Sequence, residues 1–127
     1  MLIGNFFTGI KKEYKRYTFS GLSFNSLNSK KGDIFFAIKG NSKDGNKFIK
    51  NAVKKKIKIV ISSNKFQGIK QNILYLRSLN VRKTLAEIAF KFYNKKPKNL
   101  IAVTGTNGKS SIAEFYFQIL RLNKKKV

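Results

Sequence analysis

The sequence predicts an α/β chain in which a small mixed-sheet domain precedes the first strand-loop-helix unit of a phosphate-binding (P-loop) domain. Short apolar runs of strand length alternate with segments that carry an apolar helical face, and this alternation is typical of α/β folds. The single proline, Pro97, lies in a polar stretch that separates the last apolar run from the others. We therefore expect one domain over residues 1–97 and a second, truncated one over residues 98–127.

The first domain should follow the order strand, helix, strand, strand, helix. Strands are predicted at three short apolar runs, residues 34–38 (IFFAI), 57–61 (IKIVI) and 72–77 (NILYLR). Residues 44–56 predict a helix with Asp44 as its N-cap, and Ser78 or Asn80 would cap the second helix. The apolar faces of the two helices consist of Phe48, Ile49, Ala52 and Val53 and of Val81, Leu85, Ile88, Ala89 and Phe92.

The second domain begins with residues 100–104 (LIAVT), which predict a buried strand, and a helix is expected from Lys109 onward. The inward face of this helix would consist of Ile112, Phe115, Tyr116, Ile119 and Leu122. One strand and one helix cannot cover both faces of a parallel sheet. We therefore expect the helix to expose apolar surface that other parts of a longer chain would cover.

The composition excludes several classes of site. The chain has no Cys and no His, which rules out thiol nucleophiles, Ser-His-Asp triads and the usual zinc sites. Its 5 Asp and Glu residues are scattered, which argues against a paired-carboxylate hydrolase. No apolar run reaches the roughly 18–20 residues of a membrane helix, and no leader peptide is evident, so we expect a cytoplasmic protein without a membrane partner.

The formal charge of +23 makes a basic nucleic-acid-binding module an alternative function. The excess comes from 24 Lys and only 4 Arg, although Arg is favoured where bases and phosphates are bound through paired hydrogen bonds. Lys, Asn, Ile and Phe make up half of the chain, and their codons are rich in A and T. An AT-rich genome explains the charge more simply, so we expect no specific nucleic-acid partner.

The most informative segment follows the last predicted strand and is formed by Gly105, Thr106, Asn107, Gly108, Lys109, Ser110 and Ser111. Its two glycines allow backbone conformations that bring amide N–H groups close to a phosphate, and the helix N-terminus adds further donors. Lys109 would neutralise β- and γ-phosphate charge, and the Ser110 hydroxyl would ligate Mg²⁺. Val103 stands where the general pattern G-x-x-x-x-G-K-[ST] has its first glycine, so a plain strand-to-helix turn is the alternative.

Three further motifs accompany this loop. They are residues 24–40 (FNSLNSKKGDIFFAIKG), which contain G-D-x-F-x-A-x-x-G, residues 44–52 (DGNKFIKNA), and the group Phe92, Tyr93 and Pro97 before the loop. Together with residues 103–111 (VTGTNGKSS), they resemble the motifs of the Mur ligases, particularly of the MurE type. The resemblance covers nearly the whole chain, with the motifs in the same order.

The resemblance implies that the first domain holds the uridine end of a UDP-sugar substrate. The residues at the matching positions are Phe24, Ser26, Asn41, Ser42 and Lys43. Without the resemblance, a solvated turn at residues 41–43 and a local backbone cap at Ser26 would be the simpler interpretation. The family's Asp-Ser-Arg stretch has Asn25 and Leu27 in place of its two charged residues here, which leaves open whether uridine still binds.

The resemblance also implies a ligase of peptidoglycan synthesis, and hence a role in cell-wall biogenesis, cell shape and cell division. Such an enzyme uses ATP and Mg²⁺ to phosphorylate the D-Glu carboxylate of UDP-MurNAc-L-Ala-D-Glu. The amine of diaminopimelate or lysine then attacks the acyl phosphate. Lys109 would be the catalytic residue of the loop, because it stabilises the transferred phosphoryl group.

The loop is shared by related ligases, so a MurF-type enzyme remains an alternative. A folylpolyglutamate synthetase is disfavoured because that branch lacks the N-terminal domain. The ligases that the chain resembles also have the rest of a central domain and a C-terminal domain, which would be the missing partners of this chain. We therefore expect the chain to be catalytically inactive alone.

Overall fold

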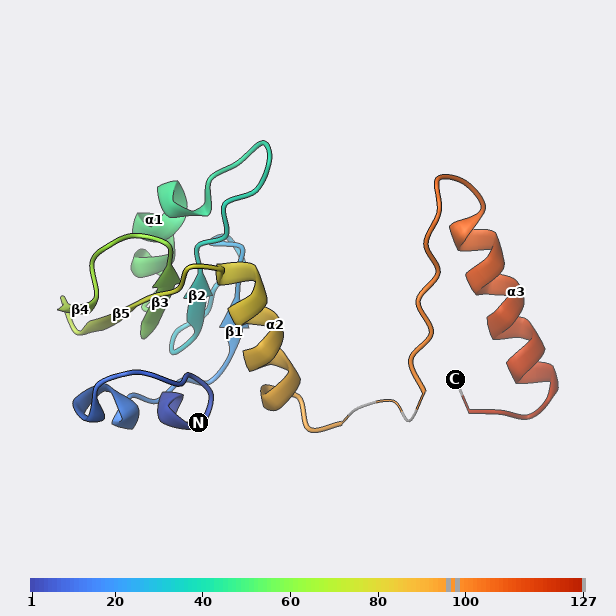
Figure 1. The fold of residues 1–127 in the computed structure, drawn as a ribbon, viewed down its shortest axis with the longest axis horizontal. Coiled ribbons are helices and arrows are strands. Elements are labelled where there is room, and N and C mark those ends of the chain that lie inside the picture. Colours follow the sequence, from blue (N-terminus) through green and yellow to red (C-terminus); the bar gives the residue numbers. More distant parts are fainter. Residues whose placement is uncertain (96, 98, 127) are drawn as a thin grey trace. The chain divides into compact units, whose positions relative to one another are not determined.

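The computed structural model describes residues 1–95, 97 and 99–126. Its contacts divide the chain into two compact units, Met1–Asn94 and Lys95–Val127 (Figure 1). Lys98, where the second domain was predicted to start, lies outside the described residues. Within the described part, no helix combines the length and the hydropathy that crossing a membrane requires.

The first unit contains a five-stranded sheet with the strand order β1-β2-β3-β5-β4 (Figure 1). The neighbouring strands are parallel except β4 and β5, which form an antiparallel hairpin. This mixed sheet with its helices confirms the predicted fold class. The strands are β1 (Leu22–Ser23), β2 (Ile34–Phe36), β3 (Ile59–Ser62), β4 (Gly68–Lys70) and β5 (Ile73–Arg77).

Helical segments precede, connect and follow these strands. The 3₁₀ helices are η1 (Ile3–Asn5), η2 (Lys12–Arg16) and η3 (Gly45–Phe48), and the α-helices are α1 (Ile49–Lys54), α2 (Val81–Phe92) and α3 (Lys109–Leu122). The helix predicted over residues 44–56 is therefore split into η3 and α1. Its predicted N-cap is correct, because the Asp44 carboxylate accepts a hydrogen bond from the Asn46 amide. Asn80 caps α2 by accepting from the Lys83 amide at 2.9 Å.

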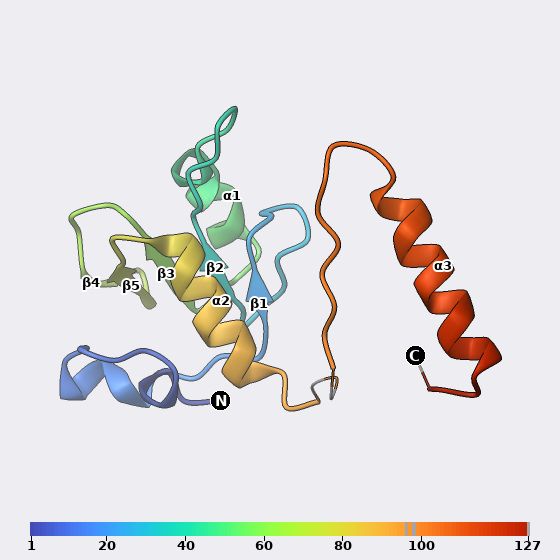
Figure 2. The same cartoon turned by 45° about the vertical axis from the view of Figure 1, so that its right-hand side comes forward.

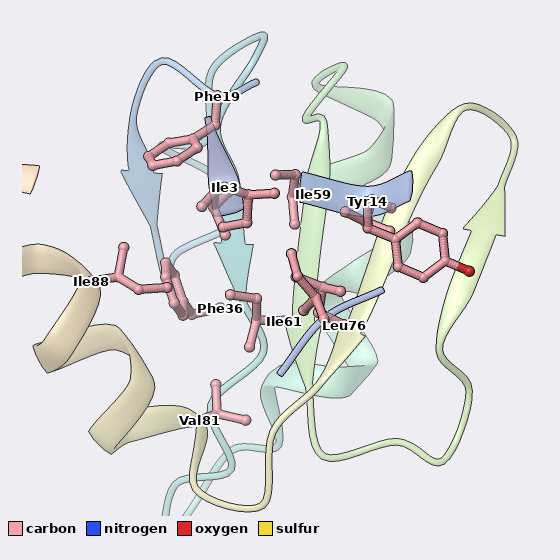
Figure 3. Packing of buried hydrophobic residues seen from close by; sticks show 12 residues of the cluster. Ile3, Tyr14, Phe19, Phe36, Ile59, Ile61, Leu76, Val81 and Ile88 are labelled. Atoms are coloured by element: carbon pink, nitrogen blue, oxygen red, sulfur yellow. The ribbon is translucent and has the colours of Figure 1, made fainter. Parts of the chain in front are cut away.

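Different elements bury the two faces of the sheet. Strand side chains alternate between the faces, so Ile34 and Phe36 of β2 join one apolar cluster while Phe35 joins the other. The first cluster is covered by the N-terminal segment and α2, as Figure 3 shows for Ile3 and Ile88. The second cluster packs under α1, and Figure 2 shows α1 and α2 from a second direction. The pocket described below is thus attached to strands that are buried on both faces.

Among its described residues, the second unit lacks the predicted strand but contains the predicted helix. Residues 100–104 do not form a strand, because a strand needs a hydrogen-bonded neighbour and the described residues of this unit contain no other extended segment paired with them. The helix α3 begins at Lys109 as predicted. The residues expected on its inward face are nevertheless exposed, namely Ile112, Phe115, Tyr116, Ile119 and Leu122. None of residues 99–126 is buried, which agrees with the expected exposure of apolar surface on α3.

Candidate functional site

The segment after β1 is held in a tight turn by its own serine and asparagine side chains. The main-chain oxygen of Asn25 accepts hydrogen bonds from the hydroxyls of Ser23 (3.0 Å) and Ser29 (3.1 Å). The side-chain oxygen of Asn25 accepts from the Leu27 amide at 3.0 Å. These bonds hold the turn while Ser26 is only 6% exposed, although its neighbours Phe24 and Leu27 are 68% and 76% exposed.

The loop after β2 forms the opposite wall. The Gly45 amide donates to the Ile38 oxygen at 2.9 Å, and the Gly40 amide donates to the Lys43 oxygen at 2.8 Å. A Cβ on Gly45 would lie 2.6 Å from the main-chain nitrogen and oxygen of Ile38, so this close approach requires glycine. The loop therefore returns tightly to β2 and carries Lys43 at its end.

Asp44 joins this loop to η3. Hydrogen bonds from the main-chain and side-chain amides of Asn46 lower the pKa of the Asp44 carboxyl, and the nearby charges of Lys39 and Lys47 lower it further. Burial acts in the opposite direction but is outweighed. A lowered pKa means that the ionised carboxylate stabilises the folded loop.

A cavity of about 400 Å³ lies between the two walls, within the usual range for small-molecule sites. It is lined by Phe24, Asn25, Ser26, Leu27, Ile38, Lys43, Gly45, Phe48 and Asn51. Three of the predicted substrate-binding residues thus line one cavity, namely Phe24, Ser26 and Lys43. The other two, Asn41 and Ser42, are exposed in the loop and are not among the lining residues.

The cavity presents an apolar rim, a buried hydroxyl and one cationic side chain. Ser26 makes no hydrogen bond within the described residues. Among these residues, Asn46 Oδ1 is the one fully buried side-chain nitrogen or oxygen atom that lacks a hydrogen-bond partner. The Ser26 hydroxyl must therefore be open to the cavity that Ser26 lines. The side chain of Lys43 is exposed, and it forms no ion pair within the part of the chain that is described. This arrangement suits a planar ring with polar edges that is joined to an anionic group.

Several lining residues were not identified from the sequence as parts of a site. From the sequence, Leu27 was noted only as a departure from the family pattern. Ile38 was assigned to a predicted strand and Gly45 to a predicted helix. Phe48 was assigned to the buried face of its helix but is 38% exposed at the cavity. Asn51 lies one turn further on, so a helical spacing from Phe48 is the signal that would have identified it.

The predicted phosphate loop lies in the second unit and has the backbone conformation that its glycines allow. Gly108 has a φ of 75° and Gly105 a φ of 154°, both in the region that favours glycine. Gly108 precedes α3 and no side chain caps the helix, so the amides of its first turn remain free to bind an anion. The Lys109 ammonium group donates to the main-chain oxygens of Gly105 and, at 3.1 Å, Thr106.

The loop fits Mg²⁺ only in part. Ser110 and Ser111 are exposed in the first turn of α3, where the Ser110 hydroxyl is a suitable single ligand. Residues 1–95, 97 and 99–126 contain no group of three or more acidic, His or Cys side chains that would hold a metal ion. Any further ligands would come from the nucleotide phosphates and water, as is usual for Mg²⁺.

Comparison with known proteins shows the family to which the chain belongs. Residues 18–93, more than half of the chain, match the family model "Mur ligase family, catalytic domain". The chain is 45% identical over 117 residues to the UDP-N-acetylmuramoyl-L-alanyl-D-glutamate–2,6-diaminopimelate ligase of Rickettsia montanensis, covering 92% of this chain and 24% of that protein. The ligase of the same name from Clostridium tetani is 44% identical over 94 residues, covering 71% of this chain and 19% of that protein.

The fold has a solved relative as well. The MurF ligase of Thermotoga maritima, determined in complex with ADP, matches 79% of this chain and 23% of its own with 26% identity and a TM-score of 0.62. The chain spans about a quarter of the length of the curated relatives that it matches. The alignment to the Rickettsia montanensis ligase leaves at most about ten residues of this chain outside, so it includes both the cavity and the loop. The chain therefore belongs to the Mur ligase family.

Proposed function

We propose that the chain supplies the UDP-sugar pocket and the nucleotide-phosphate loop of a MurE-type ligase. The complete reaction would add diaminopimelate to UDP-MurNAc-L-Ala-D-Glu, as the names of the relatives indicate. The ADP complex of the related MurF ligase supports ATP as its energy source. The relatives' names support diaminopimelate, rather than lysine, as the amino acid. The domain boundary near Pro97 and the cytoplasmic location remain predictions.

The observation that carries the proposal is the cavity with the unpaired Ser26 hydroxyl. This hydroxyl has no partner within the described residues and is open to the cavity, so it is free to form a hydrogen bond with a ligand there. The exposed rings of Phe24 and Phe48 offer flat apolar surface to a uracil ring. The Lys43 ammonium group would lie toward the diphosphate, and no acidic side chain lines the cavity to oppose it.

In the second unit, the chain's own residues would hold and polarise the nucleotide phosphates. ATP supplies the phosphoryl group that activates the substrate carboxylate. The free amides at the start of α3 would bind phosphate oxygens, and the Ser110 hydroxyl would ligate Mg²⁺. Lys109 would exchange the oxygens of Gly105 and Thr106 for the phosphates and so stabilise the transferred group. The ADP complex of the related MurF ligase supports a nucleotide site in this family.

Calorimetric titration of the 127-residue chain with UDP-MurNAc-L-Ala-D-Glu tests the pocket. We expect Ser26→Ala to weaken binding about three- to tenfold, because it removes one neutral hydrogen bond worth roughly 0.5–1.5 kcal/mol. Lys43→Ala should weaken binding about threefold, and the loss should shrink at high salt because the side chain is exposed.

The matched controls are Ser63→Ala and Lys65→Ala, which remove the same groups from exposed positions between β3 and β4. Both should bind as the unchanged chain does. Absence of binding by the unchanged chain, or an equal loss for the Ser63 variant, would contradict the proposed pocket.

A further inference from the structure

Asn25 lies at the centre of the turn that shapes the pocket, and its two carbonyl oxygens are both engaged. Its main-chain oxygen accepts from the Asn28 amide at 3.1 Å in addition to the two serine hydroxyls described above. Those hydroxyls, of Ser23 and Ser29, are also 2.8 Å from each other. The side-chain oxygen of Asn25 holds the Leu27 amide. The Asn25 side chain therefore closes a turn whose main-chain oxygen is already contacted by three hydrogen-bond donors.

This turn surrounds the one hydroxyl that the pocket leaves unpaired. Ser26 lies between Asn25 and Leu27, which the Asn25 side chain links directly. Without that link, the Leu27 amide would lose its acceptor, and residues 25–27 would gain conformations in which Ser26 no longer faces the cavity. Since an amide oxygen accepts a hydrogen bond as a carboxylate oxygen does, the absence of a charge at position 25 leaves the turn intact.

We propose that Asn25 is a positioning residue of the pocket: its side-chain oxygen, bound to the Leu27 amide, holds the Ser26 hydroxyl toward the uridine end of the ligand. The inference rests on the proposed function of the pocket. It also explains how the pocket could still bind uridine with Asn25 and Leu27 in place of the family's Asp and Arg. The acceptor that the turn needs is retained, and Leu27 adds apolar rim beside Phe24, where a nucleobase ring gains contact area.

Uridine is the appropriate probe because it has no charge, so that a carboxylate at position 25 would not repel it. Its affinity for the 127-residue chain is measured by NMR titration. We expect Asn25→Ala to weaken uridine binding about five- to tenfold, and Asn25→Asp to restore it to within about twofold, because the carboxylate accepts from the Leu27 amide. Asn28→Ala is the matched control, because the exposed Asn28 side chain makes no hydrogen bond within the described residues. It should bind as the unchanged chain does.

A double-mutant cycle separates positioning from general destabilisation. If Asn25 acts through Ser26, Asn25→Ala should add less than about twofold to the loss already caused by Ser26→Ala. Circular dichroism reports whether each variant folds. If Asn25→Ala does not fold, Asn25→Ser replaces it, since a serine hydroxyl is a weaker acceptor at the same place and should give an intermediate loss.

Three outcomes would overturn the inference while leaving the proposed pocket in place. They are unchanged uridine binding in Asn25→Ala, an equal loss in Asn25→Asp, which would indicate a direct contact from the amide nitrogen, and additive losses in the cycle. Binding of UDP-MurNAc-L-Ala-D-Glu without any binding of uridine would overturn it too, since Ser26 would then not serve the uridine end. If the unchanged chain binds neither ligand, the proposed function fails together with the inference.

Discussion

The two units of the chain support their candidate sites in different ways. In the first unit, the pocket walls follow directly from β1 and β2, whose neighbours in the sheet are buried on both faces. In the second unit, the phosphate loop precedes a 14-residue helix, and none of residues 99–126 is buried. An isolated helix of about 12–15 residues is only marginally stable in water. The first site is therefore preorganised by packing, whereas the second depends on local backbone preferences.

The two sites differ in what must become ordered when a ligand binds. A ligand in the pocket meets a turn and a loop whose main chains are already held by hydrogen bonds, so little backbone conformational entropy is lost on binding. A nucleotide at the loop must also order Lys109, which is hydrogen-bonded to the loop itself. We therefore expect the 127-residue chain to bind its UDP-sugar more tightly than its nucleotide.

A pair of matched Phe→Ala substitutions should give the largest effect. Phe36 is fully buried in β2, whereas Phe115 of α3 is 63% exposed. Phe36→Ala should lower the free energy of unfolding by about 3–5 kcal/mol, because it removes apolar contacts and leaves a cavity. Phe115→Ala should change it by about 0.5 kcal/mol or less. Urea denaturation followed by circular dichroism measures both.

Similar losses for the two variants would show that α3 is as firmly packed as the sheet and would remove the contrast. A loss of this size approaches the whole stability of a small domain, so Phe36→Ala needs a milder variant beside it. Ile61→Val then provides a milder probe of the same cluster, with an expected loss of about 1 kcal/mol.

The same contrast explains how far the sequence predicted the fold. The strands at Ile34, Ile59 and Ile73 were predicted because each is a run of apolar residues, and Asn80 was among the expected caps because Asn favours that position. The strands β1 and β4 each contain a single large apolar residue, Leu22 and Ile69, so neither forms an apolar run. Residues 100–104 have the composition of a strand, but strand formation depends on a partner as well as on composition.

The site was predictable to the extent that it lies in local motifs. Phe24 and Ser26 lie within the stretch of residues 24–40 that resembles a family motif, and Lys43 lies in the loop directly after it, so their positions could be assigned from the sequence. Phe48 and Asn51 reach the same cavity from η3 and α1, about 25 residues after Phe24 and Ser26, in a motif for which the sequence predicted only a helix. A helical pattern indicates that Phe48 is apolar and on one face, but it does not distinguish a core from a cavity wall.

A change at Lys109 should have the second largest effect and tests the second unit alone. Lys109→Ala should weaken binding of a non-hydrolysable Mg²⁺–ATP analogue about tenfold or more, because a charged hydrogen bond contributes roughly 1.5–3 kcal/mol. Binding of UDP-MurNAc-L-Ala-D-Glu should be unchanged, since its pocket lies in the other unit. Calorimetry at about 0.15 M salt limits non-specific attraction to this +23 chain.

The control for that substitution is Lys125→Ala, which removes one exposed positive charge beyond the end of α3. It should leave nucleotide binding unchanged. If both variants lose affinity equally, the attraction is general to a basic chain, and the loop is not a specific phosphate site.

Asp44 should give the smallest effect, a pH dependence confined to the first unit. Hydrogen bonds from Asn46 hold the pKa of its carboxyl below the usual value of 3.8, so the carboxylate stabilises the fold above that pH. This contribution should be lost as the pH falls through the lowered pKa of the folded state. Asp44→Asn should therefore remove part of the acid sensitivity measured by urea denaturation between about pH 2.5 and 7.

The control is Glu13→Gln, because the exposed Glu13 carboxylate makes no hydrogen bond or ion pair within the described ranges. If the stability of the unchanged chain and of Asp44→Asn depends on pH in the same way, the charge of Asp44 does not stabilise the loop that carries Lys43. That outcome would contradict an electrostatic contribution of Asp44 to the preorganised pocket.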